Sequence, residues 1–216
     1  MQGRARSLSL HRLSTLRFSS NLVYLENAVT AAEEETLVRY VAPLLMARRY
    51  EDGHWDSVIS KYKEIELVPS QSPPEVRALL TRLAERVMAE YEHKPVLQSM
   101  LPPHVVDLAA EGSISPHVDN IRHSGAVLAG LSLLSTRVMR LEKEADREKQ
   151  IAPTPESVIE QVLKARSLYM LKGPLRYEYA HSILGPNEAP LHKTCGISFK
   201  RRISIVFRDA VSQQDK

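Results

Sequence analysis

The chain has 216 residues, of which 43% are hydrophobic and 25% are charged, as in an ordinary folded domain. This length predicts one domain, or one domain with an extension, and allows a sizeable buried core. The only cysteine is Cys195, which excludes an internal disulfide framework and a cysteine-rich zinc site. No apolar run in the sequence approaches the length of a membrane span.

The start of the chain differs in composition from the rest. Residues 1–20 contain four Arg and five Ser but no acidic residue, and the first carboxylate is Glu26. Such a start is typical of a mitochondrial transit peptide, and a disordered basic tail is the alternative. We therefore expect a transit peptide over residues 1–25, a domain over residues 26–209, a disordered tail over residues 210–216, and a location in the mitochondrial matrix.

The positive charge of the chain belongs to its first 20 residues. The whole chain carries a formal charge of +3, from 29 basic and 26 acidic residues. Removing the four Arg of residues 1–20 leaves 25 basic and 26 acidic residues, a net charge of −1. The remaining domain thus offers no net-charge argument for nucleic-acid binding, although a local basic patch stays open.

Two amphipathic helices are predicted before residue 100. The first begins at Thr30, where Glu33 completes a capping box and apolar residues follow at helical spacing. The second begins at Ser72, with Pro73 at its first helical position and Glu75 completing another capping box.

After about residue 100 the sequence changes to short apolar or alternating runs divided by turns, which predicts an antiparallel sheet. The runs are HVVDLAA, GAVLAGLSLLS, RVMRLEKE, SLYMLKG and RRISIVFRD. Residues 157–165 are ambiguous, because their apolar residues have helical spacing while their neighbours are strands. Residues 142–156 are expected to be a charged loop. Helices followed by strands predict an α+β fold or a β-sandwich with a helical flank.

The segment ISPHVDN contains a possible pair of metal ligands. In an extended segment residues i and i+2 point the same way, so His117 and Asp119 can face one ion. His181, in the predicted strand YEYAHSIL, is the best candidate for a third ligand. Two His and one carboxylate form the ligand set of non-haem Fe(II) oxygenases. A second His-x-Asp pair, His54 and Asp56, lies beside the helices and is the alternative.

The run RRISIVFR places Arg202, Ser204 and Arg208 on one face of a strand and its Ile and Phe residues on the other. Two Arg on a buried face are costly unless they meet anions. Their Cα atoms would be roughly 20 Å apart, and side chains leaning inward could bind the two ends of a small dicarboxylate. An edge strand with both Arg in water is the alternative.

These residues carry a resemblance to a known family. His117-x-Asp119, a distal His181, then Arg202-x-Ser204 and Arg208 resemble the AlkB family of Fe(II)/2-oxoglutarate dioxygenases. The chain is most similar to the mitochondrial branch of that family, over roughly residues 30–209. The similar segments, in order, are EEETL, RRYEDGHWD, ISPHVDNI, LAGLSLLS, VMRL, SLYMLKG and RRISIVFR.

The resemblance implies a fold and a set of ligands. The fold would be a double-stranded β-helix, or jelly roll, with flanking N-terminal helices and a strand at residues 157–165. The His54 and Asp56 segment would belong to the scaffold. The implied Fe(II) ligands are His117, Asp119 and His181. The implied 2-oxoglutarate ligands are Tyr169, Arg202 and Ser204 at the distal carboxylate and Arg208 at the other end.

The resemblance also implies an activity but leaves the substrate open. The enzyme would convert 2-oxoglutarate and O2 to succinate and CO2 while oxidising a C–H bond. Relatives that repair nucleic acid carry a recognition lid before the iron motif, where this chain has two helices and a linker, and aromatic residues are only 6% of the chain. Base recognition needs stacking surfaces and phosphate contacts. We therefore expect a protein side chain as the substrate.

Further expectations complete this interpretation. Demethylation of mitochondrial tRNA is the alternative reaction, and a non-catalytic β-sandwich used for binding is the alternative class. The branch that the chain resembles is associated with programmed necrosis and fatty-acid metabolism. We expect a monomer without a membrane span.

Overall fold

A computed structural model describes residues 20–52, 58–91, 99–122, 124–188, 190 and 197–211. Within these residues one sheet of nine strands has the order β1-β7-β4-β9-β3-β8-β5-β6, with β2 paired to β3. The strands are β1 (Leu22–Leu25), β2 (Ile59–Glu66), β3 (His104–His117), β4 (Leu128–Leu133), β5 (Arg137–Lys143), β6 (Val158–Leu163), β7 (Leu168–Leu171), β8 (Tyr179–Ile183) and β9 (Arg202–Arg208). The helices are α2 (Ala31–Met46), η1 (Pro69–Gln71), α3 (Pro74–Met88), α4 (Glu144–Glu148) and α5 (Pro174–Tyr177).

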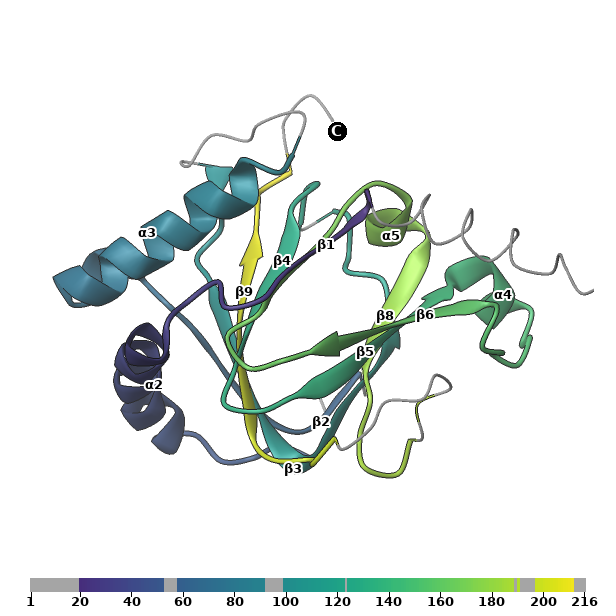
Figure 1. Cartoon of the computed structure of the whole chain (residues 1–216), viewed down its shortest axis with the longest axis horizontal. Coiled ribbons are helices and arrows are strands. Elements are labelled where there is room, and N and C mark those ends of the chain that lie inside the picture. The colour runs from purple at the N-terminus through teal and green to yellow at the C-terminus, as the bar shows by residue number, and fades with distance from the viewer. Residues whose placement is uncertain are drawn as a thin grey trace, which may run out of the picture.

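The sheet is curled into two facing groups of antiparallel strands (Figure 1). The 14-residue strand β3 belongs to both groups, because its first half pairs with β9 and its end pairs with β8. Strands β7, β4 and β9 continue one group, and β8, β5 and β6 make the other. This arrangement is the jelly-roll-like double-stranded β-helix that the resemblance implied.

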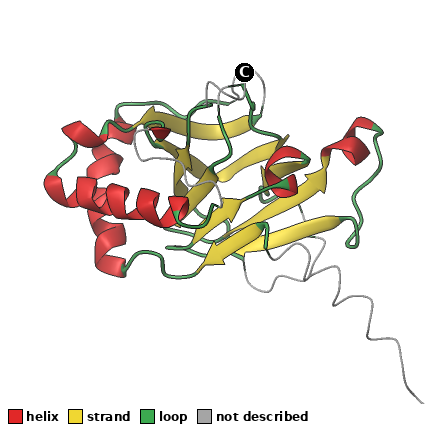
Figure 2. Cartoon of the chain, turned by 90° about the horizontal axis from the view of Figure 1, so that it is seen from above, coloured by secondary structure: helices red, strands yellow, loops and turns green. Residues whose placement is uncertain are grey.

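Two clusters of buried apolar side chains hold the fold together. One joins the apolar faces of α2 and α3 to the outer face of the sheet, and Figure 2 shows both helices on one side of the strands. The other cluster fills the space between the two groups of strands and includes Val106, Met139, Tyr169 and Val206. The helices therefore stiffen one layer from outside, while the interior of the jelly roll is lined by alternate residues of the strands.

The predicted N-terminus of the first helix is confirmed. The Thr30 hydroxyl oxygen accepts a hydrogen bond from the Glu33 amide at 3.2 Å, and the Thr30 amide donates to the Glu33 carboxylate at 2.8 Å. The two bonds are the reciprocal pair of the capping box that the sequence predicted, with Thr30 as the N-cap residue and Ala31 as the first residue of α2.

The predicted capping box of the second helix is wrong. The helix α3 begins at Pro74 with Pro73 at the N-cap position, and no side chain caps it. The hydroxyl of Ser72 instead donates to the Tyr40 hydroxyl and to the Val68 carbonyl oxygen. Ser72 closes the short helix η1, so it is not free to cap α3.

Other elements agree only in part with those that the sequence predicts. The strand at residues 157–165 is confirmed as β6, whereas the expected loop at residues 142–156 contains the short helix α4. Strands β1 and β2 were not predicted, and β1 lies within the expected transit peptide, where it pairs with β7. Residues 1–19 and 212–216, which hold most of the expected leader and tail, lie outside the described residues.

The strand that carries the two arginines is central in the sheet. It lies between β4 and β3, and Arg202 is only 1% exposed. The alternative of an edge strand with both arginines in water is therefore wrong. None of the described helices has the length and apolarity needed to span a membrane.

Candidate metal centre

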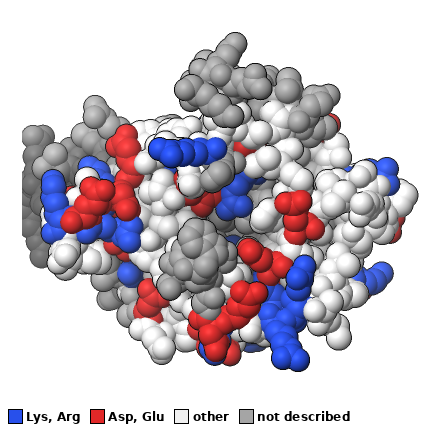
Figure 3. Space-filling model, turned by 180° about the vertical axis from the view of Figure 1, so that it is seen from behind, with Lys and Arg blue, Asp and Glu red and all other residues white. Residues whose placement is uncertain are grey.

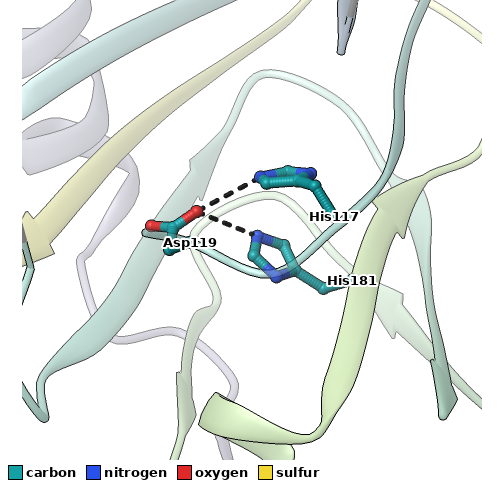
Figure 4. A group of neighbouring side chains, drawn as sticks. All are labelled: His117, Asp119 and His181. Atoms are coloured by element: carbon teal, nitrogen blue, oxygen red, sulfur yellow. Dashed lines mark ion pairs between the residues drawn. The ribbon is translucent and has the colours of Figure 1, made fainter. Parts of the chain in front are cut away.

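Three possible metal ligands meet where β3 ends. His117 of β3 and His181 of β8 are direct cross-strand partners, and their ring centroids are 4.2 Å apart. Asp119 follows two residues after His117, and one ligand atom from each of the three side chains lies within 4.8 Å of the others. Figure 4 shows the three side chains pointing toward one another. The third possible ligand thus lies on the neighbouring strand β8.

The carboxylate of Asp119 lies between the two histidines and an arginine. Its Oδ1 atom is 3.2 Å from Nε2 of His117 and 3.7 Å from Nε2 of His181 (Figure 4). Its Oδ2 atom accepts a hydrogen bond from Nε of Arg208 at 2.6 Å. Because β3 ends at His117, strand alternation alone does not place Asp119. The following loop and the bond to Arg208 hold it.

The hydrogen bond on the far side of the His117 ring fixes its orientation. Nδ1 of His117 is 2.9 Å from the carbonyl oxygen of Ser115. A carbonyl oxygen only accepts, so Nδ1 carries a proton and is the donor of this bond. The other nitrogen, Nε2, therefore faces Asp119 and His181, on the side where a metal ion would bind.

Burial and neighbouring charges set the protonation of the other two ligands. Although burial acts to raise it, the contacts with His117 and Arg208 hold the pKa of the Asp119 carboxyl well below its ordinary value. Burial, followed by repulsion from His117, lowers the pKa of His181 to about 3. At neutral pH the site thus presents a carboxylate and a neutral imidazole, the forms that bind a cation.

A buried arginine that the sequence analysis missed holds the loop of Asp119. Arg176 of α5 is 1% exposed and donates from Nη1 to the Asp119 carbonyl oxygen at 3.0 Å. It also donates from Nη2 to the Ser124 carbonyl oxygen at 3.1 Å. Both bonds join residues more than 50 positions apart in the sequence, so no local pattern could have indicated them.

A row of polar side chains continues from the metal centre along the inner face of β9. Ser204 is 2% exposed and lies opposite Ser132 of β4. Arg202 lies two residues before Ser204 on the same face of β9, and it donates from Nε to the Ser132 hydroxyl at 2.8 Å. Its Nη2 atom is buried and has no hydrogen-bond partner among the described residues. A buried cationic donor without a protein partner fits an anionic ligand at this position.

Tyr169 stands beside this row because the strand next to it carries a glycine. Tyr169 of β7 is the cross-strand partner of Gly130 in β4, which in turn lies opposite Val206 of β9. A Cβ atom added to Gly130 would be 2.5 Å from Cε1 of the Tyr169 ring. The absence of a side chain at Gly130 therefore leaves room for the ring to lie against β4.

The donor set of the site fits a divalent iron ion together with an anionic ligand. Two imidazole nitrogens and one carboxylate oxygen converge from one side, which leaves positions open on the other. Arg202 lies at the far end of the same face, and Arg208 lies at the near end on Asp119. The predicted residues His117, Asp119, His181, Tyr169, Arg202, Ser204 and Arg208 are thus all brought to the interior of the jelly roll.

The rival ligand pair, His54 and Asp56, lies outside the described residues. Another histidine, His104 at the start of β3, has a partly exposed side chain 3.3 Å from the Glu66 carboxylate. Among the described residues, only His117, Asp119 and His181 form a group of three possible metal ligands.

The sequence is similar to one family model and to curated proteins. Residues 44–208 match the model of the 2OG-Fe(II) oxygenase superfamily. The chain is 39% identical over 180 residues to the mitochondrial alpha-ketoglutarate-dependent dioxygenase alkB homolog 7 of Bos taurus, covering 83% of this chain and 74% of that protein. It is 36% identical over 178 residues to the Mus musculus protein of the same name, covering 82% and 72%.

The fold is similar to those of solved structures with little sequence identity. A prolyl hydroxylase of Trichoplax adhaerens, in complex with a hypoxia inducible factor peptide fragment, matches with a TM-score of 0.63 and 10% identity over 94% of this chain and 91% of that chain. A prolyl-4-hydroxylase of Pseudomonas putida matches with a TM-score of 0.60 and 11% identity over 94% and 99%.

Proposed function

Because the chain belongs to the 2OG-Fe(II) oxygenase superfamily and, within it, to the AlkB family, we propose that His117, Asp119 and His181 bind its Fe(II). The protein is a 2-oxoglutarate-dependent dioxygenase. Bound Fe(II) supplies the site for the reaction of O2 with 2-oxoglutarate, whose products are succinate, CO2 and an oxidised substrate C–H bond. The observation that carries the ligand assignment is the cross-strand pairing of the two histidines beside Asp119.

Arg202, Ser204 and Tyr169 bind the distal carboxylate of 2-oxoglutarate in this proposal. The unpartnered Nη2 atom of buried Arg202 supports it, because a carboxylate oxygen would complete that donor. Ser132 orients the guanidinium by accepting from its Nε atom, and Gly130 makes room for Tyr169.

Arg208 has two tasks near the metal. Its bond to Oδ2 of Asp119 leaves Oδ1 toward the histidines, so it orients the carboxylate as a ligand. It also places a positive charge where the 2-oxo acid end of the co-substrate binds. Arg176 holds the backbone of the same loop through the Asp119 carbonyl oxygen.

An anaerobic titration tests the enzyme against a non-catalytic binding protein. Adding Fe(II) and then 2-oxoglutarate to the wild type should produce the visible absorption of their complex, and Asp119→Ala should not. His104→Ala removes a histidine outside the site and should behave as the wild type, and so should His54→Ala. Absorption retained in Asp119→Ala but lost in His54→Ala would show that the rival pair binds the metal.

A protein side chain is the substrate that we favour. The chain without residues 1–20 has a net charge of −1, and aromatic residues are only 6% of the whole chain. On the face shown in Figure 3, lysine and arginine are mixed with aspartate and glutamate instead of forming one broad basic field. Such a surface offers little to the phosphates and bases of a nucleic acid. Demethylation of mitochondrial tRNA is the second candidate, and the mitochondrial names of the relatives favour it over other RNA.

Two experiments separate these substrates. Proteomics that compares mitochondria containing wild-type enzyme with mitochondria containing Asp119→Ala should find a side chain that gains an oxygen atom only with the wild type. The second assay uses folded mitochondrial tRNA, because its shape could replace a recognition lid. Robust demethylation of that tRNA, lost in Asp119→Ala, would decide for the second candidate and against a protein substrate.

The composition of residues 1–20 and the names of the relatives support a mitochondrial enzyme, and we place it in the matrix. Since β1 is part of the sheet, the leader should end before Leu22. A fluorescent protein fused to residues 1–30 should enter mitochondria, and deletion of residues 1–20 should leave an active enzyme in the cytosol. Import of the truncated form would contradict the leader. We further propose that the enzyme is a monomer. Its role would lie in the necrosis and fatty-acid metabolism associated with the branch.

A further inference from the structure

A second buried arginine lies near Arg202 and has no assigned task. Arg137, the first residue of β5, is fully buried. On β5 it shares a face with Met139 and Leu141, which belong to the cluster inside the jelly roll. Its side chain therefore starts on the inner face. No carboxylate of the described residues forms an ion pair with it. A buried guanidinium without a counter-ion is costly, which suggests that its partner is a ligand.

The hydrogen bonds of Arg137 place its guanidinium at the start of β9. Nη2 of Arg137 donates to the carbonyl oxygens of Ala109, Ala110 and Lys200, at 2.7, 3.0 and 2.8 Å. Lys200 precedes Arg202 by two residues, and Ala109 follows Leu108, the cross-strand partner of Arg202. The side chain thus crosses from one group of strands to the other and ends beside the backbone that carries Arg202.

Both arginines keep donors without partners. Nε and Nη1 of Arg137 and Nη2 of Arg202 are buried and make no hydrogen bond within the described residues. Burial and repulsion by Arg202, opposed by Glu111, lower the pKa of Arg137 to about 10, so this group is still a cation at neutral pH. The ring of Phe199, 5.0 Å from Cζ of Arg137, is an incomplete substitute for an anion. Two neighbouring buried cations with free donors form a site for a carboxylate.

We propose that Arg137 is a second guanidinium at the distal carboxylate of 2-oxoglutarate, acting together with Arg202. The co-substrate pocket then ends in two positive charges, and the enzyme requires an acid with a carboxylate at both ends. This inference rests on the proposed function, which supplies the co-substrate. It adds a residue that determines which 2-oxo acid is accepted.

A purely structural task for Arg137 predicts a different result. Its three bonds to carbonyl oxygens also join β5 to β3 and to the segment before β9, and loss of them would disturb every ligand of the pocket. A contact with the distal carboxylate affects only ligands that have one. The discriminating pair of ligands is therefore 2-oxoglutarate and 2-oxopentanoate, which has the same 2-oxo acid end and chain length but a methyl group in place of the distal carboxylate.

The experiment is calorimetry on the full-length protein loaded with Ni(II), which holds the 2-oxo acid without turnover. The wild type should bind 2-oxoglutarate much more tightly than 2-oxopentanoate. Arg137→Met should weaken 2-oxoglutarate binding by roughly 10- to 100-fold, the range of a charged hydrogen bond, and leave 2-oxopentanoate binding unchanged. Ser135→Ala is the matched control, because its hydroxyl donates to the same Lys200 carbonyl oxygen without a charge. It should leave both affinities unchanged.

The outcomes separate the two proposals. Equal weakening of both ligands by Arg137→Met, or no weakening of either, would overturn the role of Arg137. A wild type that does not prefer 2-oxoglutarate over 2-oxopentanoate would overturn the proposed function of the pocket itself. If Arg137→Met does not fold, Arg137→Lys decides, since it keeps the charge but not the fork of donors. That variant should bind 2-oxoglutarate several-fold more weakly with 2-oxopentanoate unchanged, and an unaltered ratio would contradict the inference.

Discussion

At the scale of single residues, the centre holds two of its three possible metal ligands, Asp119 and His181, in the protonation states that a cation needs. Asp119 is 8% exposed, yet its contacts with His117 and Arg208 keep it ionised. The His181 ring, whose Nε2 atom is 3.7 Å from Oδ1 of Asp119, stays neutral because it is buried. A metal ion can therefore bind without first displacing a proton from either side chain.

This arrangement predicts how the stability of the metal-free protein depends on pH. The pKa of His181 is about 3 in the folded state and about 6.5 in the unfolded chain. Below pH 6.5 the unfolded chain binds a proton at His181 that the folded protein does not, so stability falls as pH falls. Asp119 contributes little to this change above pH 5, because its loss of stability begins near the unfolded pKa of about 3.9.

The measurement is the free energy of unfolding of the metal-free wild type and of His181→Gln at pH 7 and pH 5. The wild type should lose on the order of 1 to 2 kcal/mol more than the variant over this interval. Other titrating groups cancel in the difference between the two proteins. Parallel pH profiles would contradict the buried neutral state of His181.

A second prediction concerns the glycine beside Tyr169. A Cβ atom at Gly130 would lie 2.5 to 2.7 Å from Cε1, Cζ and Oη of the Tyr169 ring, so Gly130→Ala must displace that ring. We expect about tenfold weaker 2-oxoglutarate binding by calorimetry and a loss of about 1 to 3 kcal/mol in the free energy of unfolding. Ala129→Gly, on the other face of the same strand, should lower stability but leave the affinity unchanged. Unchanged affinity in Gly130→Ala would mean that Tyr169 does not contact the co-substrate.

The residues that sequence reasoning found and missed differ in the range of their interactions. The alternation of Arg202, Ser204 and Arg208 with apolar residues is a local pattern, so it predicted their common face. Arg176 and Arg137 bind carbonyl oxygens that are at least 27 positions away in the sequence. Their sequence neighbourhood carries no sign of those partners, and only the folded backbone brings them together.

At the scale of elements, β9 combines the core and the site because its two faces have different environments. Ile203, Ile205 and Phe207 pack toward the helices, whereas Val206 faces the interior beside the site residues. The sequence predicted these faces but could not exclude an edge strand, since the pairing of β9 with β4 and β3 involves residues far apart in the chain. In β6 the apolar residues have helical spacing, but the segment is a strand because it pairs with β5.

The start of β9 is fixed by a cluster of charged and polar side chains on the outer face. Asp107 of β3 is fully buried and accepts from Nε and Nη2 of Arg201 at 2.8 and 3.0 Å. The Tyr50 hydroxyl lies 3.2 Å from both carboxylate oxygens, which attaches the segment after α2 to the same point. Arg201 directly precedes Arg202, so this cluster also positions the backbone of the co-substrate pocket.

Removing one partner should therefore cost more than a surface ion pair would. Arg201→Met leaves the buried Asp107 carboxylate without its guanidinium, and we expect the free energy of unfolding to fall by about 2 to 3 kcal/mol. The value lies below that of a fully buried pair because 42% of the Arg201 side chain is exposed. Adding Asp107→Asn should restore part of the loss in a double-mutant cycle. A loss below about 0.5 kcal/mol would mean that the pair behaves as an exposed one.

At the scale of the whole molecule, the amino-acid pattern alone predicted an α+β fold or a β-sandwich with a helical flank, and the jelly roll came only from the resemblance. Helix capping and the alternation of apolar and polar residues are local patterns, so α2 and most strands could be predicted from the sequence. The sheet order is not local, because β3 pairs with β2, β8 and β9, which lie far apart from one another in the sequence. The same long-range pairing makes His117 and His181 neighbours, so the metal centre is a property of the complete sheet.

The charge distribution of the whole molecule leads to a last prediction, on nucleic-acid binding. Each phosphate contact makes the logarithm of the binding constant fall by about 0.9 per logarithmic unit of salt for a duplex and about 0.7 for a single strand. Without residues 1–20 the chain has a net charge of −1, and all four Arg of that segment are lost. The truncated protein should therefore bind short RNA and DNA weakly, and the logarithm of its binding constant should fall with the logarithm of the salt concentration with a slope shallower than about −2.

The full-length chain serves as the internal control, because its four additional Arg should steepen this slope by roughly 3 for single strands. Tight binding by the truncated protein with a steep slope would reveal a basic surface that the net charge conceals, and would favour RNA over a protein side chain as the substrate.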